Sequence, residues 1–245
     1  MTLPSLRSLR TFILSPTTFF DERPPAETLL IAAGIVVVFA VCLAGAVVLF
    51  GSILAGSVDA TVTMDNPDRP PEWVCNQHGD DPDSILAENC DEPETIDRDA
   101  GALLQEEIQG YAIVALVSPF VLWLVGGIVL FAAGRLAGGT PTVPGSFALA
   151  GWAAVPEFAR LAAVLVGFWY VFRNVTITDP ESEAAVLENA IASLDPILLI
   201  LSLLTLAWQW YLLAGGLSRE ANVSWPSAAV AVGIPLAIFG VFSVF

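Results

Sequence analysis

The run TLLIAAGIVVVFAVCLAGAVVLFGSILAGSV, residues 28–58, contains no charged side chain over 31 positions. A transmembrane helix needs about 20 mainly apolar residues to cross roughly 30 Å of hydrocarbon. Arg7 and Arg10 precede the run, as basic residues precede a signal peptide, but the apolar part of a signal peptide is only about 7–15 residues long. We therefore expect a retained membrane-spanning helix over about residues 28–55.

The composition of the whole chain indicates a membrane protein. Of its 245 residues, 56% are hydrophobic and 14% are charged, which is too apolar for one water-soluble domain. A span over 146–172 is also expected, bent at Pro156, although Glu157 and Arg160 interrupt its apolar character. The predicted fold class is an all-α polytopic bundle of five transmembrane helices, at about residues 28–55, 110–133, 146–172, 196–217 and 226–245.

The distribution of charge predicts the orientation of this bundle. Residues 57–110 contain 15 acidic residues against Arg69 and Arg98, and carry −13 of the total net charge of −16. Five spans place six of the nine arginines on the side opposite this segment, which the positive-inside rule makes cytoplasmic. The sequence therefore predicts a cytoplasmic N-terminal segment (1–27), a membrane domain (28–245) and an outer acidic loop (57–109).

The acidic balance also bears on habitat and partners. Lysine is absent, and 25 acidic residues face nine arginines. A strongly acidic surface keeps a protein soluble where salt screens repulsion, so we interpret it as an adaptation to high salt. The same charge argues against nucleic acid as a partner.

The predicted outer loop contains two of the three cysteines, Cys75 and Cys90. A disulfide that closes a loop of about 15 residues stabilises by roughly 3 kcal/mol. Free thiols are a second interpretation, and a zinc site that includes His78 is a third, because the spacing in CNQH suits metal ligands. Asn174 begins a glycosylation triplet, NVT, on the predicted outer side.

No catalytic, cofactor or metal motif was found. The sequence contains no HExxH, GxSxG or Walker A pattern, so the prediction is that the protein is not an enzyme. Glu157 and Arg160 are spaced to pair on one helical face. We favour a pair at the cytoplasmic interface; the alternative is a gate in a small transporter or channel, whose pathway would also need the few polar span residues Ser118, Ser202, Thr205 and Gln209.

Three separated segments carry a resemblance to a known family: SPTTFFDERPP (15–25), GRLAGGTPTVPGSFALAGWAAVPEF (134–158) and WQWYLLAGGLSREANVSWPSAAVAVGIP (208–235). In this order they resemble the Yip family of five-span membrane proteins, and the prokaryotic branch in particular. The resemblance implies a five-helix bundle with a cytoplasmic N-terminus. Within the middle segment, Arg135, Gly138 and Gly139 form a long turn that could serve as a docking surface.

The predicted function is that of a scaffold or adaptor without catalysis in the plasma membrane. The predicted spans are rich in small residues, which let helices approach each other closely in lipid. We therefore expect the partners to be the lipid bilayer and either a second copy of the chain or other membrane proteins. A small transporter or channel is the alternative function, and a membrane enzyme is a second, less favoured one.

Overall fold

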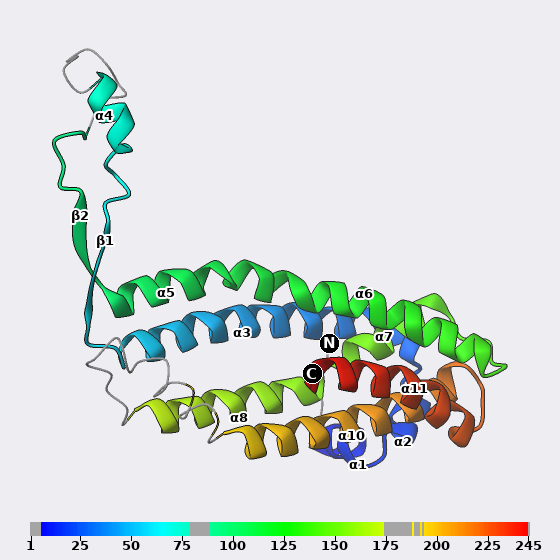
Figure 1. Cartoon of the computed structure of the whole chain (residues 1–245). Coiled ribbons are helices and arrows are strands. Elements are labelled where there is room, and N and C mark those ends of the chain that lie inside the picture. The colour runs from blue at the N-terminus through cyan, green and yellow to red at the C-terminus, as the bar shows by residue number, and fades with distance from the viewer. Residues whose placement is uncertain (1–5, 79–88, 174–187, 189–191, 193, 245) are drawn as a thin grey trace.

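A computed structural model describes residues 6–78, 89–173, 188, 192 and 194–244 of the chain. The long helices lie side by side along one direction, and a two-stranded arm projects from one end of the bundle (Figure 1). We call this the arm end. The opposite end, where the N-terminal helices and a buried hydrophobic cluster lie, is called the core end.

Four helical segments in the described part of the chain are long and apolar enough to cross a membrane: Pro25–Ala55, Ala100–Leu136, Val143–Phe172 and Asp195–Glu220. A further apolar helix is shorter in its described part, Trp225–Ile238. The individual elements are α3 (Leu29–Ala55), α5 (Ala100–Gly110), α6 (Ala112–Leu136), α7 (Val143–Trp152), α8 (Val155–Phe172), α10 (Asp195–Glu220) and α11 (Trp225–Val244).

The helix α7 occupies a central position at the core end. It packs against α3, α6 and α10. Two residues in a turn, Ala153 and Ala154, separate it from α8. The sequence predicted a bend at Pro156, and the structure has the break just before this residue, because a proline is readily accommodated in the first turn of a helix but not in its interior.

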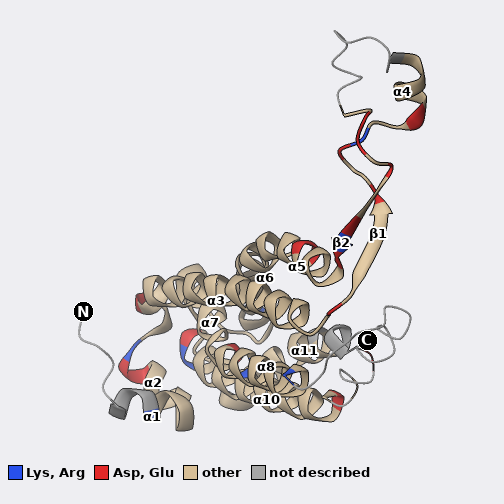
Figure 2. Ribbon diagram, turned by 90° about the vertical axis from the view of Figure 1, so that its left-hand side faces the viewer, with Lys and Arg blue, Asp and Glu red and all other residues tan. Residues whose placement is uncertain are grey.

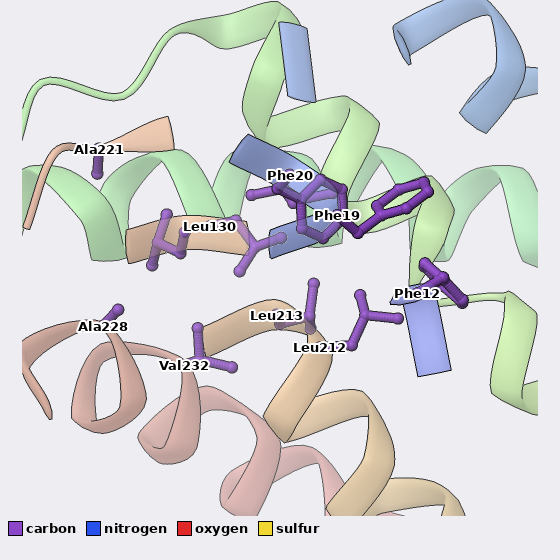
Figure 3. Close-up of a cluster of buried hydrophobic side chains, with 11 residues drawn as sticks. Phe12, Phe19, Phe20, Leu130, Leu212, Leu213, Ala221, Ala228 and Val232 are labelled. Atoms are coloured by element: carbon purple, nitrogen blue, oxygen red, sulfur yellow. The ribbon is translucent and has the colours of Figure 1, made fainter. Parts of the chain in front are cut away.

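The N-terminal segment folds back onto α10. It forms α1 (Leu6–Leu14), α2 (Pro16–Glu22) and a 3-10 turn, η1 (Pro25–Thr28). Its aromatic side chains join leucines of α10 and small residues of α11 in one buried cluster (Figure 3). The members of this cluster are Phe12, Phe19, Phe20, Leu130, Leu149, Leu212, Leu213, Leu217, Ala221, Ala228 and Val232.

The acidic segment forms a structured arm. Its strands β1 (Thr61–Asp65) and β2 (Thr95–Asp99) pair antiparallel, and α4 (Glu72–His78) lies beyond them. Acidic residues are spread along this arm (Figure 2). The expected loop boundary at residue 109 differs from the structure, in which α5 already begins at Ala100 and packs against α3.

The early start of α5 has a local cause. The Asp99 side chain accepts a hydrogen bond of 2.6 Å from the Ala102 backbone N–H, which is a helix N-cap. Gly101 lets the new helix approach α3 closely, because a Cβ at this position would lie 2.6 Å from the Ala55 carbonyl oxygen. The charges of Glu106 and Glu107 concealed this helix in the sequence.

Candidate docking site at the core end of the bundle

The three segments that carry the family resemblance meet at the core end. Glu220, at the end of α10, accepts hydrogen bonds from the backbone N–H of Thr142 at 2.9 Å and from its hydroxyl at 2.5 Å. Thr142 is itself the N-cap of α7 and accepts from the Gly145 N–H at 3.1 Å. The Glu220 carboxylate fills the space where a Gly145 side chain would lie. The start of α7 is thus fixed to the end of α10 by a carboxylate beside the positive end of the α7 dipole.

The N-terminal segment joins the same place through α2. Asp21 forms an ion pair of 2.9 Å with Arg219, and the buried Phe20 ring lies against Gly216. Pro16 lies against Gly215 in the same way. Two adjacent glycines in α10 therefore let α2 lie directly on the helix backbone.

A cavity of about 540 Å³ opens between these segments. Phe20 and Trp225 give it aromatic walls, and Asp21, Arg219 and Glu220 give it charge. Because Asp21 and Arg219 neutralise each other and Glu220 pairs with no cation in the described part of the chain, the lining carries one net negative charge. The full lining is Thr17, Phe20, Asp21, Pro24, Pro25, Ser218, Arg219, Glu220, Asn222, Val223, Ser224 and Trp225.

The predicted docking turn lies beside this cavity. Gly138 has a φ of 81°, a left-handed conformation that glycine adopts without strain. Gly139 lies against the Ala221 carbonyl, and the N–H of the next residue, Thr140, donates to that oxygen at 2.9 Å. Arg135 is exposed, with its guanidinium 5.3 Å from the centre of the Phe131 ring. The two glycines therefore close the turn onto Ala221, and Arg135 remains accessible.

The Glu157–Arg160 pair lies in a different place. Arg160 Nε donates to Glu157 at 2.7 Å, and Gln209 Nε2 of α10 donates to Glu157 at 2.9 Å and to the Ala153 carbonyl at 3.0 Å. Gln209 thus joins α10 to the break between α7 and α8. Gln209 lies about 16 Å from Glu220 along α10, at 1.5 Å per residue, so the pair is away from the turn at Arg135.

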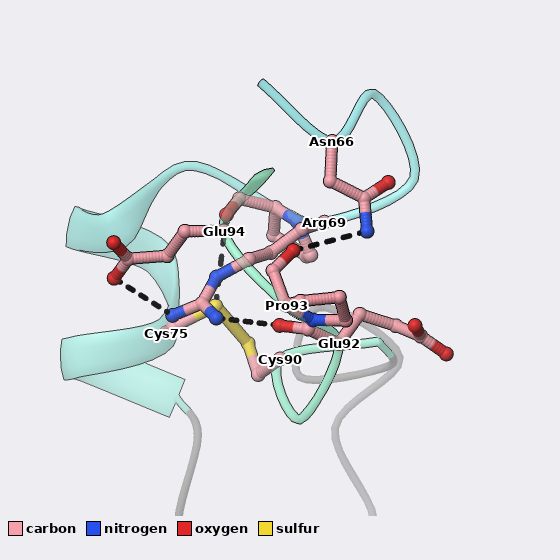
Figure 4. Close-up of polar contacts among 8 residues, drawn as sticks. Asn66, Arg69, Cys75, Cys90, Glu92, Pro93 and Glu94 are labelled. Carbon is pink, nitrogen blue, oxygen red and sulfur yellow. Dashed lines mark hydrogen bonds and ion pairs between the residues drawn. A yellow bond between two sulfur atoms is a disulfide. The ribbon is translucent and has the colours of Figure 1, made fainter. Parts of the chain in front are cut away.

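The cysteines of the arm are joined in the structure. Cys75 and Cys90 form a disulfide, with Cα atoms 5.5 Å apart (Figure 4). Arg69 contacts the chain just after Cys90. Its guanidinium donates to the Glu92 carbonyl at 2.5 Å and lies 3.5 Å from the Glu94 carboxylate. Cys75 is therefore not a free thiolate, as the zinc interpretation would require. Cys42 is an exposed free cysteine on α3.

Several predicted residues contribute little to a site. The Ser118 hydroxyl bonds within its own helix, to the Ala115 carbonyl, and Thr205 is buried. Asn174 and the side chain of His78 lie outside the described residues. Within the described residues, no group of three or more His, Cys, Asp or Glu is placed to hold a metal ion.

Sequence reasoning missed four residues of the core-end site: Asp21, Thr142, Arg219 and Glu220. Thr142 carried a usable signal, because a threonine followed by Val-Pro is typical of a helix N-cap with proline in the first turn. The partner of Thr142 lies 78 residues further along the chain, and no local pattern indicates so distant a pairing.

A family model described as the Yip1 domain matches residues 10–245. Because the match covers nearly the whole chain, the protein belongs to the Yip1 family, which confirms the resemblance of the three segments. No curated protein and no solved structure matches the chain. Family membership and four membrane-capable helices together establish a multi-pass membrane protein.

Proposed function

We propose that this Yip1-family protein is a non-catalytic scaffold of the plasma membrane. In this proposal its core end faces the cytoplasm and its acidic arm faces outward, with α11 as the fifth span. The cavity at the core end holds a short basic segment of a partner membrane protein, taken from the cytoplasmic flank of one of the partner's spans.

The main support is the way the cavity is built. Its walls come from α2, from the end of α10 and from the start of α11, and the Glu220 contact to Thr142 fixes α7 behind them. A recognition site is effective when its walls are preorganised, since little conformational entropy is then lost on binding. In this chain the buried cluster and the Glu220 contact to Thr142 supply that preorganisation.

Charge supports the kind of partner. The lining carries a net negative charge beside the aromatic rings of Phe20 and Trp225. Cytoplasmic flanks of membrane spans are enriched in Lys and Arg, with Trp and Tyr at the same interface. Such a segment complements the cavity in charge, and its cations also bind well over the exposed ring of Trp225.

Site-specific photo-crosslinking in intact cells tests this proposal. A photoreactive amino acid replaces Thr17, which lines the cavity, or Thr18, which is exposed on the same helix but outside the lining. We expect the Thr17 probe to capture membrane proteins through basic segments next to their spans, and the Glu220→Arg variant to abolish the capture. Equal capture from both positions, or capture that survives Glu220→Arg, would refute a cavity-specific scaffold.

A further inference from the structure

The apolar surface is short on the side of α8. From Glu157 to Phe172 along α8 is about 22 Å, at 1.5 Å per residue. A bilayer's hydrocarbon is roughly 30 Å thick. If the outer edge of the hydrocarbon lies at the arm end of α8, the polar cluster of Glu157, Arg160 and Gln209 lies about 8 Å inside the opposite edge of the hydrocarbon.

The opposite side of the bundle is longer. On α3, the helix from Leu29 to Ala55 contains no charged residue and spans about 39 Å, and Leu30 near its start is 80% exposed. Phe39 of α3 and Phe158 of α8 pack with their ring centres 5.1 Å apart. The polar cluster is thus at the level of the middle of α3, where the α3 surface is entirely apolar.

The short helix α1 marks the same level on the α10 side. The Leu14 carbonyl accepts from the Tyr211 hydroxyl at 3.2 Å, and Tyr211 is two residues from Gln209. Arg10, Ile13 and Leu14 are exposed. If α1 lies in the plane of the membrane interface, as amphipathic helices with a basic face do, the interface on this side is near Gln209.

Arg160 is the charged group of this cluster whose hydrogen bonding is incomplete. Its side chain is 43% exposed, and in the described part of the chain its one ion-pair partner is Glu157, bonded through Nε. The other guanidinium N–H groups are therefore available as hydrogen-bond donors. A guanidinium binds phosphate oxygens with two parallel hydrogen bonds, and in hydrocarbon an unsatisfied charge is costly.

We propose that Arg160 binds the phosphate of a phospholipid headgroup from the leaflet at the core end. The headgroup descends to the exposed Arg160 of α8, so the bilayer is thinner on this side of the protein than beside α3. Thinning by several ångströms has a modest energetic cost per ångström, and the bonds to Arg160 offset it. This site is independent of the proposed scaffold function, since it shares no residue with the core-end cavity.

Retention of lipid by the purified full-length protein tests the site. Vesicles of phosphatidylglycerol and phosphatidylcholine supply the lipid, and native mass spectrometry counts the molecules retained. Because bonds to a charged group are strong, we expect Arg160→Gln to retain about tenfold less phosphatidylglycerol and Arg160→Lys to retain an intermediate amount. Arg135→Gln is the control, since Arg135 is another exposed arginine and lies at the core end.

Two outcomes of this experiment would overturn the site. Equal losses for Arg160→Gln and Arg135→Gln would mean general surface attraction, and no loss for Arg160→Gln would mean that the residue does not bind lipid. If millimolar inorganic phosphate displaces the retained lipid, the site takes free phosphate and the lipid assignment fails. Unchanged thermal unfolding of Arg160→Gln shows that a loss of lipid is not a loss of fold.

Spin labels test the thinning directly. Ala159 and Val38 are exposed at the same level, because they neighbour the paired Phe158 and Phe39. In a Cys42→Ser background, we expect a label on Ala159→Cys to collide with a water-soluble nickel chelate several-fold more often than a label on Val38→Cys. Equal collision with the nickel chelate at both positions, with dissolved oxygen as the more frequent collision partner, would contradict a thinned bilayer beside α8.

Discussion

Glu220 and Thr142 are 78 residues apart in sequence, and their side chains meet at 2.5 Å, where the end of α10 holds the start of α7. The same carboxylate accepts from the Thr142 backbone N–H. One side chain thereby replaces part of the hydrogen bonding that the first turn of α7 lacks. This contact connects two of the three segments that carry the family resemblance.

Removal of this contact is expected to destabilise the core end. Glu220→Ala leaves the Thr142 donors without their acceptor and should lower the free energy of unfolding by about 1–2 kcal/mol. Gly145→Ala should have a cost of its own, because the added methyl group occupies the space of the carboxylate. Thermal unfolding in detergent measures both.

The double variant Gly145→Ala/Glu220→Ala checks the physical reason. With the carboxylate gone, the methyl group at position 145 meets less obstruction, so the double variant should lose less stability than the sum of the single variants. Strict additivity would show that Gly145 and Glu220 do not act on each other.

The buried cluster predicts a contrast between two leucines on one helix. Leu212 is fully buried against the N-terminal aromatic residues, whereas Leu203 is 56% exposed on the membrane-facing part of α10. Leu212→Ala should lower stability by about 2–5 kcal/mol through the cavity it leaves. Leu203→Ala should have a much smaller effect, since lipid replaces the lost contacts. Similar losses at the two positions would argue against a packed core end.

The Asp21–Arg219 pair should contribute little to stability. Both side chains are about half exposed, and ion pairs of this kind contribute roughly 0–1 kcal/mol. We expect Asp21→Asn to leave thermal unfolding nearly unchanged while making the cavity lining less negative. A large loss of stability would mean that the pair contributes more to stability than its exposure predicts.

The disulfide should stabilise the arm alone. Cys75 and Cys90 enclose a loop of about 15 residues, so Cys75→Ser/Cys90→Ser should destabilise the arm tip by roughly 3 kcal/mol. Limited proteolysis should then cut the arm faster, while the bundle unfolds at the same temperature as in the parent protein. A drop in bundle stability would show that the arm supports the helices.

Much of the bundle could be predicted from the sequence, because long uncharged runs have one physical solution in a membrane. The runs around Val36, Val125 and Leu201 all lie in long helices of the structure. The early start of α5 could not be predicted, since Glu106 and Glu107 make its sequence look like part of a loop. The part of a helix that extends beyond the hydrocarbon of the membrane is polar, so a hydropathy pattern does not reveal it.

The candidate site was less accessible to sequence reasoning than the helices. Glu157 and Arg160 are neighbours on one helix, so their pairing followed from spacing alone. The bond from Gln209 to Glu157 joins residues 52 positions apart, and its formation depends on how α8 and α10 pack. Contacts between helices follow from side-chain fit, which a single sequence does not display.

Cysteine accessibility in sealed right-side-out vesicles tests the central claim, that the core end faces the cytoplasm and the arm faces outward. In a background without the native cysteines, Asp65→Cys reports on the arm and Ser227→Cys reports on the core end, where Ser227 is exposed at the start of α11. We predict that a membrane-impermeant thiol reagent labels the Asp65 variant at once and the Ser227 variant only after lysis. Labelling of the Ser227 variant from outside would place the cavity away from the cytoplasm and would contradict the proposed scaffold.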